Sequence, residues 1–356
     1  MTGLEELGWG APFAEAFALR GEPGEVPARV IISYAREARV DDGEREWRAV
    51  FAGKTRRAAR AEKPTVGDWV AVRPAAAGTE LGSIEAVLPR RARFTRRAAG
   101  MVAEEQVLAA NVDAAFIVMG LDADYNLRRL ERYLALTYAS GATPLVVLSK
   151  ADLCDDVPVR LAEVAGVASG VMVVAARLLD EVPAEVRAAL APGRTAVLLG
   201  SSGVGKSTLI NRLLHGEVQR TRAVRAKDHR GKHTTTHRQL FKVSGGGLVI
   251  DSPGLREIQL WHGEEGVDAA FDDVERLATR CHFRDCHHDD EPGCAVCAAV
   301  AAGELSSDRL ASWHKLHAEL AAAAAKEDPF ARRERKAEER AGSRLMRQVL
   351  KEKKLK

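Results

Sequence analysis

The fold of this chain is indicated by one stretch, Gly200-Ser201-Ser202-Gly203-Val204-Gly205-Lys206-Ser207. It matches the phosphate-loop pattern G-x-x-x-x-G-K-[ST] at every fixed position. The apolar run 196–199 precedes the stretch and a helix-like segment follows it, so the loop is expected to join a buried strand to a helix N-terminus. Backbone N–H groups of such a loop and the adjacent helix dipole attract anions. The stretch therefore predicts a binding site for nucleotide phosphates.

Individual residues of this stretch have separate expected roles. The backbone N–H groups of residues 200–205 should surround the phosphates, and Lys206 should reach the β- and γ-phosphates. The hydroxyl of Ser207 should bind Mg²⁺. Thr208, the next residue, is expected to belong to the same nucleotide site.

Two further motifs complete a guanine-nucleotide set, but in an unusual order. Asp251-Ser252-Pro253-Gly254 is a D-x-x-G switch, in which Asp251 should hold Mg²⁺ directly or through water and the Gly254 N–H should face the γ-phosphate. Ser149-Lys150-Ala151-Asp152 is a base-reading element of the [NS]-K-x-D kind, with Lys150 lying across the base. Asp152 can accept hydrogen bonds from guanine N1–H and N2–H₂, which adenine does not offer. This element precedes the phosphate loop, whereas in an ordinary GTPase it follows.

A polar segment rich in Lys and Arg between the phosphate loop and the D-x-x-G motif is expected to be a mobile switch. It contains the run Gly231-Lys232-His233-Thr234-Thr235-Thr236, and one of its three threonines should bind Mg²⁺; we favour Thr235. Leu255 stands where Ras-like enzymes place the glutamine that orients the attacking water. His233 is our candidate for that role, and the alternative is an ordinary solvent-exposed loop histidine.

Four of the five cysteines fall between Cys281 and Cys297, while Cys154 stands alone. Cys281, Cys286, His288 and Cys294 together offer three thiolates and one imidazole, a ligand set that suits tetrahedral Zn²⁺. Spacing leaves Cys297 as an alternative ligand, so a Cys₃His and a Cys₄ site both stay open, and His282 and His287 compete as well. Because the sequence offers no adjacent general base, we expect a structural site.

Patterning divides the chain into four parts. Short β-rich runs between residues 28 and 94 predict a small barrel with basic loops, either of the OB type or of the SH3-like type. From about residue 110, apolar runs alternate with helical segments, which is typical of a doubly wound α/β sheet. A helical region surrounds the cysteines, and a charged helix or tail follows. The expected boundaries are 1–100, 101–262, 263–325 and 326–356.

Bulk composition limits the function classes. The chain has 356 residues, of which 46% are hydrophobic and 29% charged, as in globular proteins. No apolar run is long enough for a membrane span, and the first residues show no secretory pattern, so we expect a cytoplasmic protein. The net charge is +3, yet residues 29–100 carry 16 Lys/Arg against 9 Asp/Glu, and residues 326–356 carry 12 against 6. Two basic flanks favour a polyanionic partner.

These motifs together resemble the RsgA family (also called YjeQ or YloQ) of circularly permuted GTPases that act in small ribosomal subunit biogenesis. The resemblance runs from about Leu7 to Ala325. It is carried by the permuted GTPase motifs and by five other stretches, which are Gly67-Asp68-Trp69-Val70, Ala110-Asn111-Val112-Asp113, Gly231-Lys232-His233-Thr234-Thr235-Thr236, Asp251-Ser252-Pro253-Gly254-Leu255-Arg256-Glu257 and Cys281-His282-Phe283-Arg284-Asp285-Cys286 through Pro292-Gly293-Cys294.

The resemblance implies an OB barrel, a permuted GTPase domain and a zinc domain. It implies a monomeric protein that docks on the 30S subunit and its 16S rRNA during late maturation, alongside other assembly factors and without a membrane. There it would hydrolyse GTP to GDP faster and then leave. It also implies that Cys281, Cys286, His288 and Cys294 hold one structural Zn²⁺ with Cys297 as an extra, and that His233 is the family's switch histidine.

Two positions depart from the family pattern. Ser149 replaces the usual asparagine of the base-reading element, and Ala175 stands where the loop that contacts guanine O6 more often has serine. We expect both departures to affect guanine affinity rather than activity. Two other functions remain as alternatives: a zinc-dependent RNA-binding adaptor with incidental GTP hydrolysis, and a P-loop NTPase that acts on another substrate.

Overall fold

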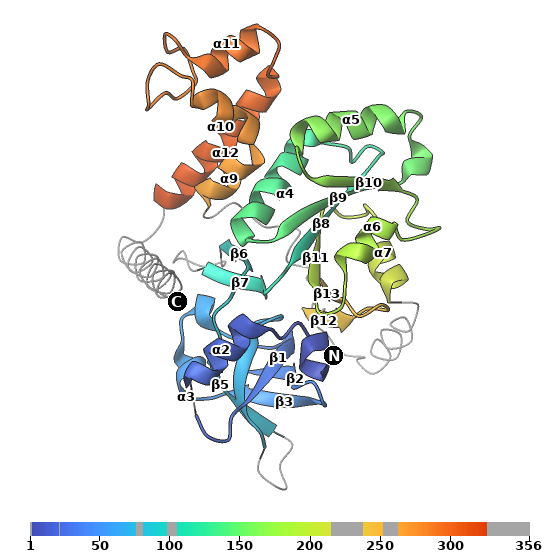
Figure 1. Cartoon of the computed structure of the whole chain (residues 1–356), viewed down its shortest axis with the longest axis vertical. Helices are drawn as coiled ribbons and strands as arrows, with labels where there is room; N and C mark the ends of the chain where they lie inside the picture. Colours follow the sequence, from blue (N-terminus) through green and yellow to red (C-terminus); the bar gives the residue numbers. More distant parts are fainter. Residues whose placement is uncertain are drawn as a thin grey trace, which may run out of the picture.

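The computed structural model describes residues 2–20, 22–75, 81–97, 105–214, 238–251 and 263–325. Within them, three parts follow one another along the molecule: an N-terminal barrel, a central sheet with helices, and a C-terminal group of helices (Figure 1). His233, Thr235 and Gly254 lie outside the described residues, as does the charged segment 326–356. None of the described helices combines the length and hydropathy that a bilayer crossing requires.

The N-terminal barrel has five strands in the order β1-β2-β3-β5-β4 and is closed by pairing of β1 with β4. β3 and β5 are parallel, and the other neighbours are antiparallel. This topology confirms the OB-type barrel and excludes the SH3-like alternative. The strands are β1 (Val26–Ser33), β2 (Glu37–Asp41), β3 (Glu46–Phe51), β4 (Trp69–Arg73) and β5 (Leu81–Val87). Helices α1 (Gly3–Glu6) and α2 (Ala11–Arg20) precede the barrel, while α3 (Gly53–Arg57) and the 3₁₀ turn η1 (Arg60–Glu62) lie between β3 and β4.

The central sheet continues in the order β10-β9-β8-β11-β13-β12. Every neighbouring pair is parallel except β12 with β13, which is antiparallel. The order and the alternating helices confirm the expected doubly wound α/β sheet. The strands are β8 (Ala114–Gly120), β9 (Thr143–Ser149), β10 (Met172–Ala176), β11 (Thr195–Leu199), β12 (Gln239–Lys242) and β13 (Leu248–Asp251).

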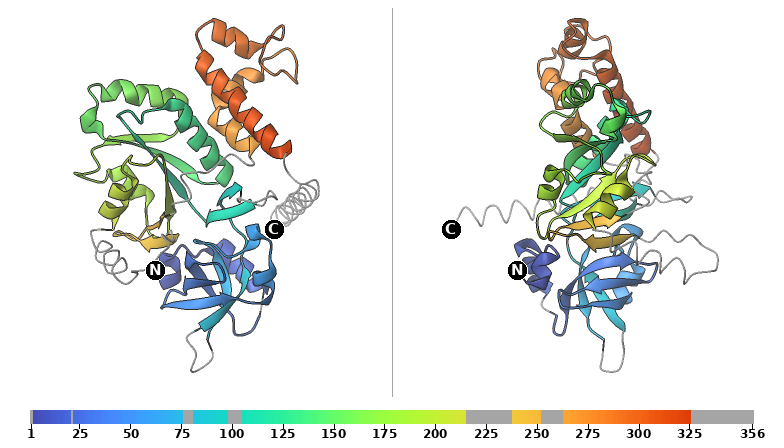
Figure 2. Two further views of the ribbon diagram at one scale, coloured as in Figure 1. Left: turned by 180° about the vertical axis from the view of Figure 1, so that it is seen from behind. Right: turned by 90° about the vertical axis from the view of Figure 1, so that its right-hand side faces the viewer.

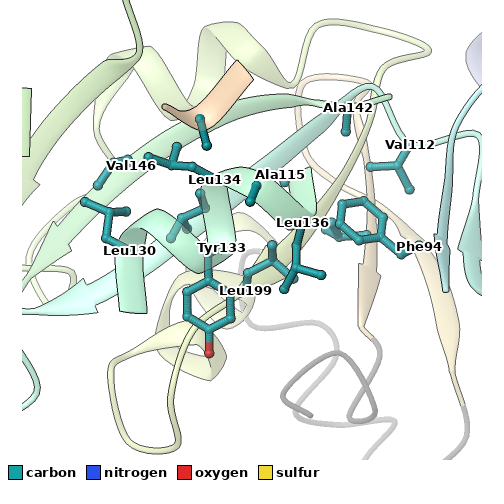
Figure 3. Packing of buried hydrophobic residues seen from close by; sticks show 14 of the residues in the cluster. Phe94, Val112, Ala115, Leu130, Tyr133, Leu134, Leu136, Ala142, Val146 and Leu199 are labelled. Atoms are coloured by element: carbon teal, nitrogen blue, oxygen red, sulfur yellow. The ribbon is translucent and has the colours of Figure 1, made fainter. Parts of the chain in front are cut away.

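Helices cover both faces of this sheet (Figure 2). They are α4 (Leu127–Ser140), α5 (Val157–Val167), α6 (Ala184–Ala189) and α7 (Lys206–Leu213), with the 3₁₀ turn η2 (Ala151–Leu153) after β9. Leu130 and Leu134 of α4 pack with Ala115 of β8 and Val146 of β9 (Figure 3). On the other face, α6 and α7 pack against the alternate residues of the same strands. The sheet is therefore buried on both sides, as its apolar strands predict.

The barrel and the central sheet are fixed together by a buried arginine. The Arg29 side chain, 2% exposed, donates hydrogen bonds to the carbonyl oxygens of Leu7, of Gly67 at 3.2 Å and of Asn111 at 3.1 Å. At Gly67 φ is +88°, and a Cβ there would lie 2.2 Å from the Ala110 carbonyl oxygen, so glycine is required. The stretches 67–70 and 110–113 therefore meet and form the joint between the two parts.

Strand pairing also links the two parts. Ile32 of β1 pairs with Gln239 of β12, which joins the barrel and the central strands into one sheet of eleven strands. A separate hairpin of β6 (Arg93–Arg97) and β7 (Glu105–Ala110) lies between the barrel and the central sheet.

The C-terminal helices pack on α4 of the central part. They are α9 (Glu264–Ala270), α10 (Asp272–Ala278), α11 (Ala295–Ala301) and α12 (Ser307–Ala325). Arg309 of α12 makes the central contact: its Nη1 lies 2.9 Å from Glu131 Oε1 of α4, and its Nη2 lies 2.8 Å from Asp273 Oδ1 of α10. The guanidinium also stacks 4.1 Å from the Phe271 ring centroid. A single buried cation thus ties α4 to the C-terminal helices.

Candidate nucleotide and metal sites

The phosphate loop connects β11 directly to α7, as its motif requires. Gly200 has φ +133°, and a Cβ there would lie 2.1 Å from the Val118 carbonyl oxygen of β8. Gly203 and Gly205 have φ +81° and +99°. Because L side chains rarely adopt these angles, the three glycines allow the loop to turn sharply above the sheet edge.

Lys206 lies at the centre of this loop and is 8% exposed. Its ammonium group donates hydrogen bonds to the carbonyl oxygen of Gly200 at 2.7 Å and to that of Ser201. Ser207 follows in the first turn of α7 and is exposed. Asp251 ends β13, the strand that pairs with β11, so its carboxylate lies at the same sheet edge as the loop. The structure thus gathers an ammonium, a hydroxyl and a carboxylate around one loop.

The base-reading element lies two strands away and is tied to the phosphate loop. Ser149 is buried, and its hydroxyl donates a hydrogen bond to the Val204 carbonyl oxygen at 2.6 Å. Strand register places Ser149 opposite Gly120 of β8 and Ala176 of β10. The serine that replaces asparagine therefore still links the base-reading loop to the phosphate loop, a role that its short side chain can fulfil.

Two charged residues that we did not predict from the sequence hold this element in place. Lys150 has φ +57°, and its Nζ lies 2.6 Å from Asp122 Oδ2. The hydrogen bond from Lys150 lowers the pKa of Asp122, so this carboxylate stays ionised. Arg177 Nε lies 3.6 Å from Asp152 Oδ2. Asp122 follows β8 and Arg177 follows β10, so both lie at the carboxyl edge of the sheet. This position directly after a strand is the one feature of the sequence that could have identified them.

Helix α4 also approaches the phosphate loop. The hydroxyl of Tyr133 points away from the core of Figure 3, and the Ser201 side chain lies close enough to influence the Tyr133 phenol. Burial raises the pKa of Tyr133, so the phenol stays neutral and able to hydrogen bond. The helix that receives the C-terminal region through Glu131 therefore reaches the nucleotide site as well.

The structure brings together Cys281, Cys286, His288 and Cys294, whose ligand atoms all lie within 4.8 Å of one another. Cys281 Sγ lies 3.9 Å from Cys294 Sγ and 3.7 Å from His288 Nδ1. Metal–sulfur distances of about 2.3 Å and metal–nitrogen distances of about 2.0 Å at tetrahedral angles give S···S of about 3.8 Å and S···N of about 3.5 Å. The four donors are therefore spaced as tetrahedral Zn²⁺ requires.

Cys297 lies beside this group but outside it. Its thiol contacts the carbonyl oxygens of Asp289 at 2.9 Å and His288 at 3.3 Å, and its N–H donates to Cys294 Sγ at 3.4 Å. Burial opposes ionisation of Cys294, but the hydrogen bond from the Cys297 N–H and other hydrogen bonds outweigh it and lower the pKa of Cys294 to about 6. Cys294 is thus prepared as a thiolate ligand, and Cys297 supports it through its backbone.

Comparison with known proteins places this chain in a family. The family model described as RsgA GTPase matches residues 87–261. A small ribosomal subunit biogenesis GTPase RsgA from Opitutus terrae is 48% identical, over 93% of this chain and 94% of that protein. The protein of that name from Syntrophotalea carbinolica is 42% identical, over 97% of this chain and 98% of its own length. The chain belongs to the RsgA GTPase family.

Solved structures agree with this membership in the RsgA family. YjeQ from Thermotoga maritima covers 83% of this chain and 98% of its own, with a TM-score of 0.62 and 27% identity. YloQ, described as a circularly permuted GTPase, has a TM-score of 0.61 at 24% identity and supports the fold. The rotated order of the motifs is therefore the circular permutation of an RsgA GTPase, and the expected permuted fold is confirmed.

Proposed function

We propose that this protein hydrolyses GTP to GDP and phosphate with Mg²⁺ while bound to the small ribosomal subunit. The proposal rests chiefly on the hydrogen bond from Ser149 to Val204, because it joins the base-reading loop to a complete phosphate loop in the permuted order. Sequence identity of 48% with a relative named for small-subunit biogenesis supports the ribosomal assignment. Hydrolysis there would act in late maturation and take place in the cytoplasm.

The nucleotide would be held by residues at the ends of three strands, β9, β11 and β13. Backbone N–H groups of residues 200–205 would receive the phosphates, Lys206 would neutralise the β- and γ-phosphates, and Ser207 with Asp251 would hold Mg²⁺. When bound, Mg²⁺ stabilises the charge that develops on the transferred phosphoryl group. We assign Gly254 to the γ-phosphate, Thr235 to the same Mg²⁺ and His233 to the attacking water. The last three assignments rest on the sequence, because these residues lie outside the described ranges.

Guanine would be selected by the base-reading loop. Asp152 lies on the turn after β9 and its carboxylate is 39% exposed, so it can accept the paired N–H groups of guanine. Lys150 is held by Asp122 with its stem beside this turn, where it can cover the base. Adenine has neither the N1–H nor the N2–H₂ donor of guanine, so we expect ATP to compete poorly with GTP.

The partner surface would include the basic part of the barrel. Lys54, Arg56 and Arg57 on α3 and the following Arg60 are all exposed. An exposed run of like charge next to an OB barrel suits a phosphate backbone, so 16S rRNA is the polyanion that we propose for it. The Cys281, Cys286, His288 and Cys294 group would bind one structural Zn²⁺ and hold α11 in the C-terminal part.

GTP turnover by the purified protein tests this function. The protein is assayed alone and with purified 30S, 50S and 70S particles, and Lys206→Ala serves as the inactive control. We expect 30S particles to stimulate GTP turnover by the wild-type protein strongly. The Lys206→Ala variant should show no turnover in any mixture. Equal turnover in every mixture would contradict the ribosomal assignment and favour a P-loop NTPase with another partner, or an adaptor with incidental hydrolysis.

A further inference from the structure

A second group of metal-ligand side chains lies in the C-terminal helices, separate from the cysteine group. Asp268 of α9, Glu275 of α10 and His317 of α12 bring one ligand atom each to within 4.8 Å of one another. One imidazole and two carboxylates are donors that proteins use for divalent transition metals. We propose that these three residues form a second metal site that binds Zn²⁺, independent of the cysteine site and of the proposed ribosomal function.

The imidazole of His317 supplies the first argument. Its Nε2 atom is buried and, within the described part of the chain, has no hydrogen-bond partner. The nearest carboxylate oxygen, Asp268 Oδ1, lies 3.6 Å away, which is too far for a hydrogen bond. A buried ring nitrogen without a partner costs free energy. A metal ion between His317 and Asp268 would give this nitrogen the partner that it lacks.

Charge supplies the second argument. Asp268 and Glu275 each bring a carboxylate oxygen into the same small group, and Glu264 and Glu265 lie in the first turn of α9, the helix that carries Asp268. Carboxylates brought together in this way repel one another. A divalent cation among them would remove that repulsion.

Outer contacts orient the proposed ligands, as is usual around metal sites. The indole N–H of Trp313 donates a hydrogen bond to Glu275 Oε1 at 3.0 Å. The same indole ring lies 4.2 Å from the His317 ring and 5.2 Å from the ring of His288, centroid to centroid. Trp313 therefore lies between the two groups of ligands and contacts two side chains of the proposed site and one of the cysteine site.

The proposed site differs from the cysteine site in its openness. The side chain of Asp268 is 45% exposed and that of His317 is 28% exposed, so solvent reaches both side chains although the Nε2 atom of His317 is itself buried. Three protein ligands leave one tetrahedral position for water. We therefore expect Zn²⁺ to exchange more readily here than in the Cys₃His group, and to fasten α9, α10 and α12 to one another when it is bound.

Metal stoichiometry of the full chain tests the proposal. Wild-type protein and the Asp268→Asn/His317→Gln variant are dialysed against the same buffered Zn²⁺, and zinc is measured by emission spectrometry. We expect two zinc ions per wild-type chain and one per variant chain. Asp272→Asn makes the same carboxylate-to-amide change at an exposed position outside both groups of ligands and should keep two. Trp313→Phe, which removes the donor to Glu275, should weaken the second site about 10-fold or more.

Cobalt distinguishes the two sites and shows whether the variant is folded. Thiolate-bound Co²⁺ has an intense sulfur-to-metal charge-transfer band, which Co²⁺ bound by nitrogen and oxygen lacks. In wild type a second equivalent should bind without adding to that band, and the Asp268→Asn/His317→Gln variant should keep the band while losing this equivalent. One zinc per wild-type chain, or loss of both ions and of the band in the variant, would overturn the proposal.

Discussion

The two joints of the central domain are built around the same residue type with opposite partners. At the barrel joint, the guanidinium of Arg29 is surrounded by carbonyl oxygens of three backbone segments. At the C-terminal joint, the guanidinium of Arg309 is surrounded by the carboxylates of Glu131 and Asp273. Both arginines are almost completely buried, at 2% and 5% exposure.

The difference appears in the acidity of the two guanidinium groups. Burial lowers the pKa of Arg29 to about 10, because uncharged carbonyl partners do not compensate for lost hydration. Burial acts on Arg309 in the same direction, but hydrogen bonds to Asp273 and Glu131 outweigh it and raise its pKa. The barrel joint thus depends on backbone geometry and the C-terminal joint on paired charge, so the two should respond differently to perturbation.

Removal of zinc should give the largest difference in stability between the C-terminal joint and the barrel joint. A chelator that strips the cysteine group should unfold α11 and the loop before it, because metal binding of about 10 kcal/mol or more supports such sites. The barrel, which has its own apolar core, should stay folded. Hydrogen exchange with and without chelator measures this, and protection lost equally in both parts would show that they fold as one unit.

Arg309→Met should be the most destabilising of the single substitutions. It leaves Glu131, which is fully buried, with the half-exposed Arg128 as its remaining ion-pair partner. Breaking such a buried pair costs about 3–5 kcal/mol. Denaturant unfolding measures the change, and Arg276→Met, which breaks an exposed pair with Asp272, is the control with an expected change below about 1 kcal/mol.

Arg29→Met should have a smaller effect, because methionine fills much of the same volume and leaves no buried charge behind. It removes one hydrogen bond from each of three carbonyl oxygens, of which that of Gly67 keeps a second donor in the Asn111 side chain. Hydrogen bonds of this kind contribute about 0.5–1.5 kcal/mol each. Arg73→Met on β4, an exposed position, is the matched control. If Arg29→Met proved more destabilising than Arg309→Met, the ranking of the two joints would be reversed.

The smallest effect concerns the link from α4 to the nucleotide. Tyr133→Phe removes the phenolic hydroxyl that lies close to Ser201. A polar contact of this kind contributes at most about 0.5–1.5 kcal/mol, so GDP affinity should fall by no more than about 10-fold. Tyr138→Phe makes the same change near the C-terminal end of α4 and should leave affinity unaltered. Fluorescent GDP titration measures both, and equal affinities in all three proteins would mean that α4 has no influence on the nucleotide.

The sequence was most informative where chemistry and spacing are local. The strands that end in motifs were predicted because buried parallel strands are nearly continuous apolar runs. β2 and β12 do not stand out in the sequence, since they contain charged residues and gain stability from their neighbours rather than from an apolar run of their own. Arg93–Arg97 forms β6, a strand in which Phe94 is buried and Arg93 is exposed, although basic residues were expected in the loops of the barrel.

The residues of the candidate sites also fall into those that the sequence predicts and those that only the fold brings together. The phosphate loop and the cysteine group each occupy one short stretch, so their residues could be named in advance. Asp122 and Arg177 meet the base-reading loop only because three strands lie side by side. Asp268, Glu275 and His317 come from three helices, and no spacing rule connects them. Side chains that converge through tertiary packing leave no periodic trace in the sequence.

The pairing of Ile32 with Gln239 has a consequence for association between molecules. A strand at the end of a sheet exposes unpaired N–H and C=O groups, onto which a strand of another chain can add. Here β12 meets the barrel, and the barrel closes on itself through β1 and β4. Among the described strands of the eleven-stranded sheet, β10 stands at one end of the strand order, whereas the other end closes through β1 and β4. The pairing of β12 with the barrel thus covers part of an edge at which two chains could otherwise aggregate.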